Sequence, residues 1–348
     1  MPQFSRESAR EMSARGNIAR WSRWRAAQAA TATMGTVLLR VVALATLLAG
    51  TAAAGDLPLV RTVFVILMEN EPWSSIKGSA TAPFINNVLL PQASYCTQYY
   101  NQGNYTLSLP SYLWLEAGTA FGINDDQPPS VHHQSTTNHL ASLLYRAGVS
   151  WKTYQEDITG TVVPLTDAYP YAVRHNGFVY FDDTTGTNNP NYAYGIAHIR
   201  PYSELSRDLT NNTVAKYNFI TPNVCHDMHD SCAPLSNQIL QGDTWLANEI
   251  PKILASSAYT NNGAIFITWD DAGVAGVPIG MIVLSPVARG QGYSSSVHYT
   301  HSSLLRTIEE IFHVMPLLGD AANATNLSDL FQAAPAPPTN LRIVATSP

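Results

Sequence analysis

One stretch of the chain decides the fold: Val60-Arg-Thr-Val-Phe-Val-Ile-Leu-Met-Glu-Asn70. β-branched and other apolar residues fill the run up to Met68, which is typical of a buried strand in a parallel sheet. The run then stops in a carboxylate, Glu69, and an amide, Asn70. Because α/β proteins bind ligands at the carboxyl ends of their strands, these two side chains are candidate ligands of a metal ion or a phosphate.

A second stretch repeats this pattern. Gly263-Ala-Ile-Phe-Ile-Thr-Trp269 reads as another buried strand, and it ends in the adjacent carboxylates Asp270 and Asp271. Acidic strand ends brought together repel one another unless a cation neutralises them, and oxygen ligands suit a hard divalent ion such as Mg²⁺, Ca²⁺ or Mn²⁺. The sequence therefore predicts a metal site made of Glu69, Asn70, Asp270 and Asp271.

Strand-like and helix-like patterns alternate along the rest of the chain. Strands are expected at 60–68, 151–154, 217–220, 264–269 and 280–284, and helices at 83–90, 109–117, 138–147, 238–256 and 302–312. Such alternation predicts an α/β fold with a mainly parallel central sheet and helices on both faces. The polar segment 158–201 is expected to form long loops over the site rather than a second domain.

Composition narrows the class of protein. The chain has 348 residues, of which 45% are hydrophobic and 13% charged, so one large domain over 55–332 is expected, followed by a Pro/Ala-rich tail at 333–348. The net charge of −6 comes without a basic stripe outside the N-terminus. This disfavours nucleic acid as a partner, and leaves a small phosphorylated substrate whose charge a cation helps to bind.

The N-terminus has the pattern of a targeting segment. Several arginines precede an apolar stretch over 37–48, and small residues end at Ala54. We expect residues 1–54 to be a signal peptide with a long n-region, cleaved near Ala54, which makes the protein secreted or periplasmic. A stable membrane span is not expected, because Arg40 interrupts the stretch and leaves it short of the ~20 apolar residues that a span needs.

A third expected strand runs into a loop rich in ligand-type residues. Two histidines and two aspartates lie within five residues, a density that structure alone rarely requires. The loop is predicted to form a second cation position, with zinc possible through the histidine pair, or to bind phosphate oxygens and transfer protons. The candidate residues of this loop are Asn223, His226, Asp227, His229 and Asp230.

The three cysteines suggest a local bridge. Cys225 and Cys232 flank this loop closely enough to form a disulfide in an oxidising compartment, and such a bridge would stiffen it. Cys96 is then left over, and burial as a small hydrophobe is expected for it.

A nucleophile is expected beside the metal. Ser108 precedes Leu109-Pro110 at the start of a helical pattern, so it is predicted to be an N-cap residue, where the helix dipole stabilises an alkoxide or a phosphate. Thr106 and Ser111 are weaker candidates. His301 stands at the start of another helix and is expected to face the same pocket.

Two common catalytic motifs are absent. No G-x-S-x-G elbow surrounds these serines, which disfavours a Ser-His-Asp esterase. No G-x-x-x-x-G-K-[ST] loop is present either, so hydrolysis of a nucleoside triphosphate by a P-loop is not supported.

With these residues assembled, the chain resembles the phosphoesterase family of secreted acid phosphatases and phospholipases C, within the alkaline phosphatase superfamily. The resemblance runs from about residue 60 to 331. Its carriers, in this order, are Met68-Glu69-Asn70, Leu107-Ser-Leu-Pro-Ser-Tyr-Leu113, Thr221-Pro-Asn223, Asp227-Met-His-Asp230, Trp269-Asp-Asp271, Tyr299-Thr-His301 and Leu304-Leu-Arg-Thr-Ile-Glu309.

The resemblance implies roles for these residues. Glu69, Asn70, Asp270 and Asp271 would hold the metal, and Ser108 would become transiently phosphorylated. His229 and His301 would be catalytic, one of them protonating the leaving group, while Asn223, His226, Asp227 and Asp230 would bind phosphate or a second metal.

The chain departs from the family pattern at three places. Many members follow Met-Glu-Asn with His-Ser-Phe-Asp, where this chain has Glu71-Pro-Trp-Ser. Many carry Asp-Glu in place of Asp270-Asp271, and many carry His-Pro-Ser where Thr106-Leu-Ser108 stands here. These changes bear on substrate and metal preference more than on reaction type.

The resulting hypothesis is a secreted, metal-dependent phosphomonoesterase of the acid-phosphatase type that acts through a phosphoserine. Its cofactor would be Mg²⁺, Ca²⁺, Mn²⁺ or Zn²⁺. One alternative is a phospholipase C-type phosphodiesterase acting on lipid head groups, for which Trp73, Trp114, Tyr169 and Tyr171 could form an aromatic mouth. A second alternative is a non-catalytic surface-binding protein on the same fold.

Overall fold

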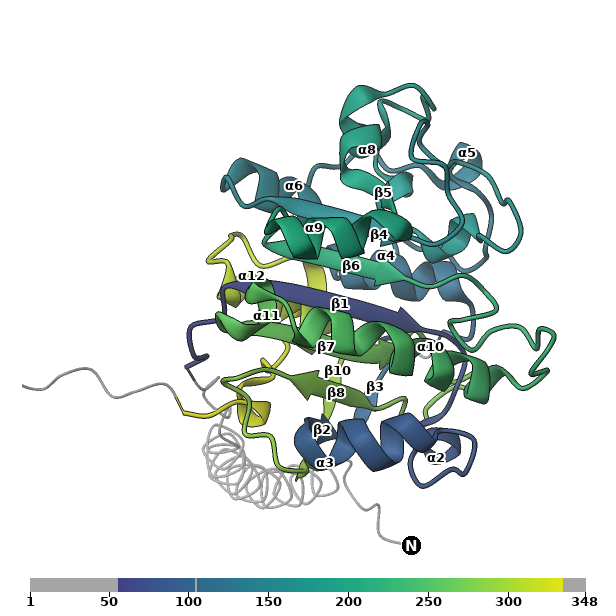
Figure 1. Cartoon of the computed structure of the whole chain (residues 1–348). Helices are drawn as coiled ribbons and strands as arrows, with labels where there is room; N and C mark the ends of the chain where they lie inside the picture. The colour runs from purple at the N-terminus through teal and green to yellow at the C-terminus, as the bar shows by residue number, and fades with distance from the viewer. Residues whose placement is uncertain (1–55, 104, 334–348) are drawn as a thin grey trace, which may run out of the picture. The chain divides into compact units, whose positions relative to one another are not determined.

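The fold is built on a large, mostly parallel sheet, shown by a computed structural model that describes residues 56–103 and 105–333 (Figure 1). The strand order is β5-β4-β6-β1-β7-β8-β2-β9, and a separate pair is formed by β10 and β3. The strands are β1 (Thr62–Met68), β2 (Ser94–Cys96), β3 (Tyr99–Tyr100), β4 (Trp151–Gln155), β5 (Ile199–Pro201), β6 (Tyr217–Thr221), β7 (Gly263–Trp269), β8 (Met281–Leu284), β9 (Tyr293–Ser295) and β10 (Tyr299–Thr300).

Helices cover both faces of this sheet. In Figure 1, α9, α10 and α11 lie in front of it, and α4, α6 and α12 lie behind it. The helices are α2 (Trp73–Ile76), α3 (Leu90–Gln92), α4 (Ser108–Ala117), α5 (Pro129–His132), α6 (Leu140–Arg146), α7 (Asp182–Thr185), α8 (Ala193–His198), α9 (Leu205–Asn211), α10 (Gln238–Leu254), α11 (Ser257–Thr260) and α12 (His301–Ile311), with a π-helix η1 (Ile85–Leu89) and 3₁₀ turns η2 (Val173–His175), η3 (Gly177–Tyr180), η4 (Tyr202–Glu204), η5 (Gly319–Ala322) and η6 (Ser328–Leu330).

The central strand β1 organises the functional edge. It pairs in parallel with β6 on one side and with β7 on the other, and every residue of β1 and β7 is buried. Met68 lies opposite Trp269 in this register, so the residues that follow the two strands leave the sheet side by side. The arrowheads of β1, β6 and β7 point to the same edge in Figure 1, which confirms the predicted α/β architecture.

All five expected strands and all five expected helical regions are present, with shifted ends. The sheet is larger than expected, because the short strands β2, β5 and β9 carry too few residues for a periodic signal. The strand β8 runs antiparallel to both of its neighbours. The region 83–90 is not a regular α-helix, since the π-helix η1 precedes α3 there.

The segment 158–201 is more structured than the expected long loops. It forms η2, η3, α7, α8 and β5, and it buries Val163, Tyr180 and Phe181 against the Leu109 face of α4 in a second, smaller apolar cluster. These apolar residues are interspersed with Asn, Thr and Gly, which hides their periodicity in the sequence. The segment therefore packs on α4 and reaches the edge where β1 and β7 end.

The expected disulfide is present between Cys225 and Cys232, and Cys96 is buried with a free thiol. The expected signal peptide at 1–54 lies outside the described residues, as does the tail beyond residue 333. In the part of the chain that the structure describes, no helix is long and apolar enough to cross a membrane.

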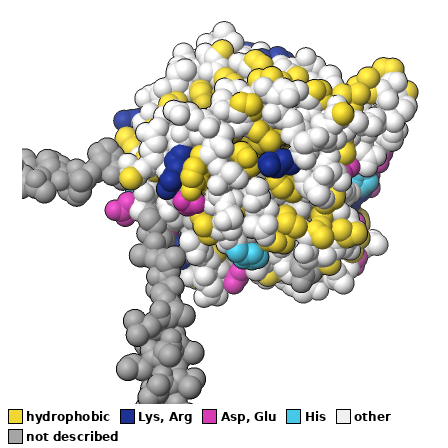
Figure 2. Space-filling model, turned by 90° about the horizontal axis from the view of Figure 1, so that it is seen from below, with side chains coloured by type: hydrophobic (Ala, Val, Ile, Leu, Met, Phe, Trp, Pro, Cys, Tyr) yellow, Lys and Arg dark blue, Asp and Glu magenta, His cyan; other side chains and the backbone are white. Residues whose placement is uncertain are grey.

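Charged side chains are sparse on the face shown in Figure 2, where single Lys, Arg, Asp and Glu residues lie among neutral and hydrophobic ones. This face presents no continuous basic stripe of the kind that binds a nucleic acid backbone. A cluster of acidic side chains is instead buried in the interior, and it is described below.

Candidate active site

Glu69 lies at the centre of the site. The end of β1 places it in the interior with no exposed surface, and its backbone N–H donates to the Asp227 carbonyl at 2.7 Å. Its Oε2 accepts a hydrogen bond from the Ser108 hydroxyl at 3.0 Å, and its Oε1 accepts one from the Tyr112 hydroxyl at 2.5 Å. The N-terminal turn of α4 therefore delivers the candidate nucleophile directly to the first candidate ligand.

Asp270 and Asp271 close the site from the end of β7, and both are fully buried. Asp270 Oδ1 accepts from the Asn70 backbone N–H at 3.1 Å, and Asp271 Oδ1 accepts from the Gly273 N–H at 2.5 Å. The other oxygen of each carboxylate, Oδ2, is buried without a hydrogen-bond partner. Buried carboxylate oxygens without partners are costly, so a missing positive charge is the simplest explanation for this pair.

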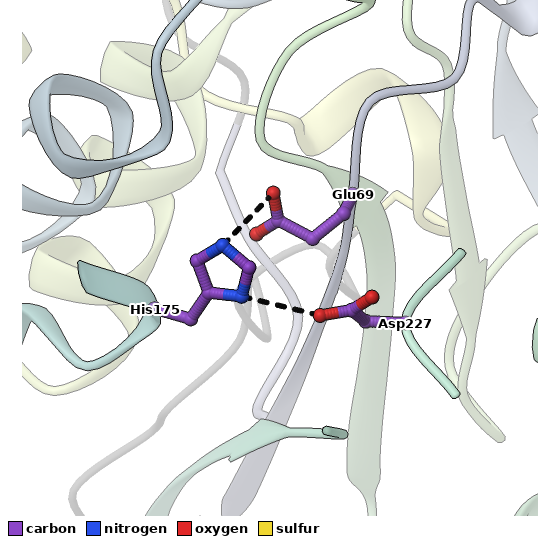
Figure 3. A group of neighbouring side chains, drawn as sticks. All are labelled: Glu69, His175 and Asp227. Atoms are coloured by element: carbon purple, nitrogen blue, oxygen red, sulfur yellow. Dashed lines mark hydrogen bonds and ion pairs between the residues drawn. The ribbon is translucent and has the colours of Figure 1, made fainter. Parts of the chain in front are cut away.

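A third group of ligand-type residues joins Glu69, as Figure 3 shows. The His175 ring lies between two carboxylates: Nδ1 is 3.2 Å from Asp227 Oδ2, and Nε2 is 3.4 Å from Glu69 Oε2, although Nε2 lacks the geometry of a hydrogen bond. One ligand atom from each of the three residues lies within 4.8 Å of the others, and all three are buried. Carboxylate and imidazole groups at this spacing suit a divalent cation.

The pKa values express the same excess of negative charge. Burial and the charges of Asp270 and Asp227 raise the pKa of Glu69 well above its usual range, and burial does the same for Asp227. Burial raises the pKa of Asp270 to about 6, and burial together with the Asp270 charge raises that of Asp271 to about 7. Carboxylates that resist ionisation together become stable anions once a cation binds among them.

The residues present therefore fit a divalent metal ion. The ligand atoms that lie within 4.8 Å of one another are two carboxylates and one imidazole, from Glu69, Asp227 and His175. Asp270 and Asp271 add two buried carboxylates whose charges act on Glu69, and each has an oxygen without a hydrogen-bond partner. Among the described residues, no lysine or arginine forms an ion pair with any of these four carboxylates, which are Glu69, Asp227, Asp270 and Asp271.

Ser108 occupies a different helix position from the one predicted. The helix α4 begins at Ser108 itself and its N-cap is Leu107, while the Leu109 N–H donates to the Asp126 carboxylate at 3.0 Å. The capping role thus belongs to Asp126, and the serine hydroxyl is left to bind Glu69 instead. Thr106 is exposed, and the buried Ser111 hydroxyl has no partner.

His301 lies under the site rather than open to it. Its Nε2 is 2.7 Å from the Asp270 carbonyl, and its Nδ1 is 3.1 Å from the Tyr99 hydroxyl. Burial lowers the pKa of His301 to about 4, so the ring is neutral and donates one N–H to that carbonyl. In this arrangement His301 holds the backbone that carries Asp270.

The loop after β6 divides its candidate residues between two places. Asp227 points inward, but Asn223 bonds to the Asp157 carboxylate at 2.6 Å and accepts the N–H groups of Cys225 and His226. His226 Nδ1 lies 2.8 Å from Glu156 Oε2. Asn223 and His226 thus line a separate cavity of about 480 Å³ beside the disulfide, and the structure does not bring their side chains to Glu69.

His229 and Asp230 form the rim between these places. His229 Nδ1 is 2.7 Å from Asp230 Oδ1, and its ring centroid lies 5.4 Å from that of His175. About a quarter of the His229 side chain is exposed, at 26%. His229 can therefore reach both the buried carboxylates and a bound substrate.

Three residues at the site were not predicted: Tyr112, Arg174 and His175. His175 is in the 3₁₀ turn η2, with no strand before it to mark it as an edge residue, and its ring stacks on Tyr112 with the planes 3° apart. Tyr112 lies one turn after Ser108 on α4 and so faces the same way, and this spacing is the signal that could have identified it.

Comparisons with known proteins identify a family and several relatives of this chain. A sequence model described as "Phosphoesterase family" matches residues 79–315. A phosphatidylinositol-3-phosphatase of Mycobacterium tuberculosis is 29% identical over 280 residues, covering 80% of this chain and 85% of that protein. A probable acid phosphatase of Kluyveromyces lactis is 24% identical over 290 residues, covering 78% of this chain and 64% of that protein.

The fold has solved counterparts. A protein in the alkaline phosphatase superfamily from Vibrio parahaemolyticus superposes with a TM-score of 0.50 at 12% identity, covering 76% of this chain and 69% of that one. At this identity the likeness concerns the fold alone, and it agrees with the mostly parallel sheet described above.

Proposed function

Because this chain belongs to the phosphoesterase family, we propose that it is a metal-dependent phosphomonoesterase whose nucleophile is Ser108. The family and its phosphatase relatives already make it a phosphoric ester hydrolase. One observation supports the finer assignment: the Ser108 hydroxyl lies 3.0 Å from Glu69 Oε2, inside a group of buried carboxylates that lacks a counter-charge.

We propose that Glu69, Asn70, Asp227, Asp270, Asp271 and His175 hold the metal. A divalent cation at these ligands would supply charge neutralisation and polarisation of the phosphoryl group. A metal bound there also removes the repulsion among the carboxylates, so binding would stabilise the fold as well as the reaction. His175 presents a neutral ring for this purpose, since burial lowers its pKa well below the usual range.

The protein groups then divide the chemistry. Glu69 accepts the Ser108 hydroxyl hydrogen and orients Oγ for in-line attack on phosphorus, where an Oγ–P bond forms as the ester P–O bond breaks. His229, held through Nδ1 by Asp230, is the proposed proton donor to the leaving alkoxide. Its Nε2 accepts from Arg174 in the free protein, so this role requires that Arg174 turns away to the substrate and that Nε2 takes up a proton. Water then attacks the phosphoserine, and release of inorganic phosphate restores Ser108. The sequence predicts a catalytic role for His301, but its bond to the Asp270 carbonyl supports a different proposal, that His301 positions Asp270.

The substrate is proposed to be a phosphate monoester, with phosphorylated lipid head groups as candidates because of the similarity to a phosphatidylinositol-3-phosphatase. No observation favours the phospholipase C alternative. Of the four aromatic residues considered for a mouth, Trp73 and Tyr171 are buried, and only Tyr169 is largely exposed, at 73%.

We also propose export from the cytoplasm. The N-terminal pattern of arginines, apolar residues and small residues supports a signal peptide. The disulfide between Cys225 and Cys232 supports an oxidising compartment, where such bonds form and persist.

The test combines metal analysis with a serine variant. We expect the purified protein to release phosphate from p-nitrophenyl phosphate, to lose this activity on chelation and to regain it with a divalent metal. Ser108→Ala should lose at least ~1,000-fold in kcat while still binding metal, because removing a nucleophile leaves binding intact. Full activity without metal would sink the metal assignment, and full activity in Ser108→Ala would sink the nucleophile.

A further inference from the structure

Arg174 is a partly buried cation without an acidic partner. Of the partly buried arginines in the described residues, Arg200 pairs with Glu204 at 2.7 Å and Arg306 pairs with Glu310 at 2.6 Å. Arg174 has a single polar contact, from Nη2 to His229 Nε2 at 3.4 Å, and no ion pair. A guanidinium has five N–H donors, so most of its hydrogen-bonding capacity is unused.

Arg174 lies at the edge of the candidate active site, where its unused N–H donors could bind a substrate. It directly precedes His175, whose ring contacts Glu69, and its guanidinium meets His229 on the rim. No ion pair joins Arg174 to the Asp227 carboxylate, whose Oδ1 accepts the His229 N–H at 2.8 Å and whose Oδ2 faces His175. The guanidinium therefore stands beside the carboxylate group with donors left for an incoming anion.

Electrostatics agree with this placement. Burial lowers the pKa of His175, and the charge of Arg174 adds to that effect. The same charge opposes the rise that burial causes in the pKa of Asp227. Arg174 thus adds positive potential to the entrance of a site whose interior is negative.

We propose that Arg174 binds a non-bridging phosphate oxygen of the substrate and makes the site prefer monoesters to diesters. A monoester carries three non-bridging oxygens and two negative charges near neutral pH, whereas a diester carries two such oxygens and one charge. The planar donor fork of arginine matches two phosphate oxygens at once, an arrangement that a diester offers less favourably. Arg174 is then a specificity-determining residue, and this role rests on the proposed function of the site.

The experiment compares two esters in two variants. For Arg174→Gln we expect kcat/KM for p-nitrophenyl phosphate to fall by ~10- to 100-fold, the range for loss of a hydrogen bond to a charged group. For methyl p-nitrophenyl phosphate we expect a change of less than about threefold, because the diester has one non-bridging oxygen and one negative charge fewer to offer to Arg174. Arg174→Lys should lie between, because it keeps the charge and loses the fork.

Inorganic phosphate gives a second readout that needs no turnover. In metal-loaded protein, calorimetric phosphate binding should weaken in Arg174→Gln by a factor similar to the loss on the monoester. Arg146→Gln is the matched control, because Arg146 also has no ion pair and bonds only to the Thr137 carbonyl and the Ser142 hydroxyl. It should leave both esters and phosphate binding unchanged.

The outcomes separate this inference from the proposed function. If kcat/KM falls by the same factor on both esters in Arg174→Gln, the role of Arg174 is overturned. Unchanged phosphate binding in folded Arg174→Gln overturns it as well. In both cases the proposed phosphatase function is unaffected. A wild-type protein that prefers the diester also overturns the role of Arg174. If the wild type releases p-nitrophenol from neither ester, the proposed function fails, and phosphate binding alone then decides for or against Arg174.

Discussion

Two side-chain clusters in this protein contain the same three residue types, Glu, His and Asp, but the pKa of the histidine is shifted in opposite directions in the two. One is Glu69, His175 and Asp227 at the edge where β1 and β6 end. The other is formed by Glu116 near the end of α4, His139 before α6 and Asp183 in α7. In the second group, His139 Nδ1 is 2.9 Å from Glu116 and Nε2 is 2.9 Å from Asp183, so both ring nitrogens have a carboxylate within hydrogen-bonding distance.

The charge balance separates the two groups. Burial lowers the pKa of His139, but its bonds to Asp183 and Glu116 outweigh burial and raise that pKa, so the ring charges more readily and can offset one of the two carboxylates. His175 has its pKa lowered, first by burial and then by the charges of Arg174 and His229. The site group also contains Asp270 and Asp271, so its negative charge exceeds anything its own residues can neutralise. We call Glu116, His139 and Asp183 the closed group, because both ring nitrogens of its histidine bond to carboxylates within the group. We call Glu69, His175, Asp227, Asp270 and Asp271 the open group, because its carboxylates need a cation from outside.

The largest expected effect comes from removing one carboxylate of the open group. Asp270→Asn keeps the shape and the oxygen that accepts the Asn70 N–H, but it loses a charge. We expect kcat/KM to fall by more than ~100-fold, since residues that only support a metal ligand already cost about 10- to 100-fold. The midpoint of thermal unfolding of the chelated variant should not fall, because a repelling charge has gone. A chelated variant that unfolds well below chelated wild type would contradict the open character of this group.

The next effect concerns the closed group. His139→Gln leaves the buried Glu116 carboxylate and the partly exposed Asp183 carboxylate without the histidine ring, and removing one partner of a buried ion pair costs about 3–5 kcal/mol of unfolding free energy. Urea denaturation should show this loss, while kcat/KM per folded molecule should stay within about twofold. Glu116 follows Ser108 by eight residues on α4, which is about 12 Å along the helix axis. Loss of activity without loss of stability would mean that the two groups are not independent.

The smallest effect is the pH dependence of the metal-free protein. The folded-state pKa values of Asp270 and Asp271 are raised to about 6 and about 7, so the folded state binds protons more tightly than the unfolded chain. Their destabilising charge is therefore present above pH 7 and is relieved as the pH falls toward 5. Differential scanning calorimetry of chelated protein should show the unfolding midpoint rising by several degrees from pH 8 to pH 5.

A saturating divalent metal provides the control for that measurement. His139, whose pKa is raised, also loses its stabilising charge as the pH rises, so both groups act in the same direction. Bound metal should remove only the part of the pH dependence of the unfolding midpoint that is due to Asp270 and Asp271. A slope that is identical with and without metal would show that the open group does not titrate as described.

The sequence predicted the part of the site that follows directly from strands. Glu69 and Asp270 come after long apolar runs whose ends are sharp, and parallel strands bring their carboxyl ends to one edge. Ser108 lies in the predicted helix, but as its first residue rather than its N-cap. Only the fold shows that the Asp126 carboxylate accepts the Leu109 N–H at the start of α4.

The rest of the site depends on contacts that have no local signal. His175 and Arg174 are in a short 3₁₀ turn that reaches the site because its segment packs on α4. The sequence places Asn223 and His226 in the same predicted phosphate or metal site as Asp227, because they are its neighbours in sequence. The structure turns them to the other side of the loop, where the Asn223 side chain accepts two backbone N–H groups.

Because the site combines residues from distant parts of the chain, phosphatase activity should require a chain that is complete through β7. The strand β1 is an early part of the domain, yet both of its partners, β6 and β7, come from the second half of the chain, and the Asn70 N–H bonds to a carboxylate 200 residues away. A nascent or truncated chain that stops before residue 263 lacks that carboxylate and its neighbour, so it contains Ser108 but only part of the metal site. Degradation fragments and unfinished chains should accordingly be silent in a phosphatase assay, which would make the assay a selection for full-length, folded molecules in any library of variants.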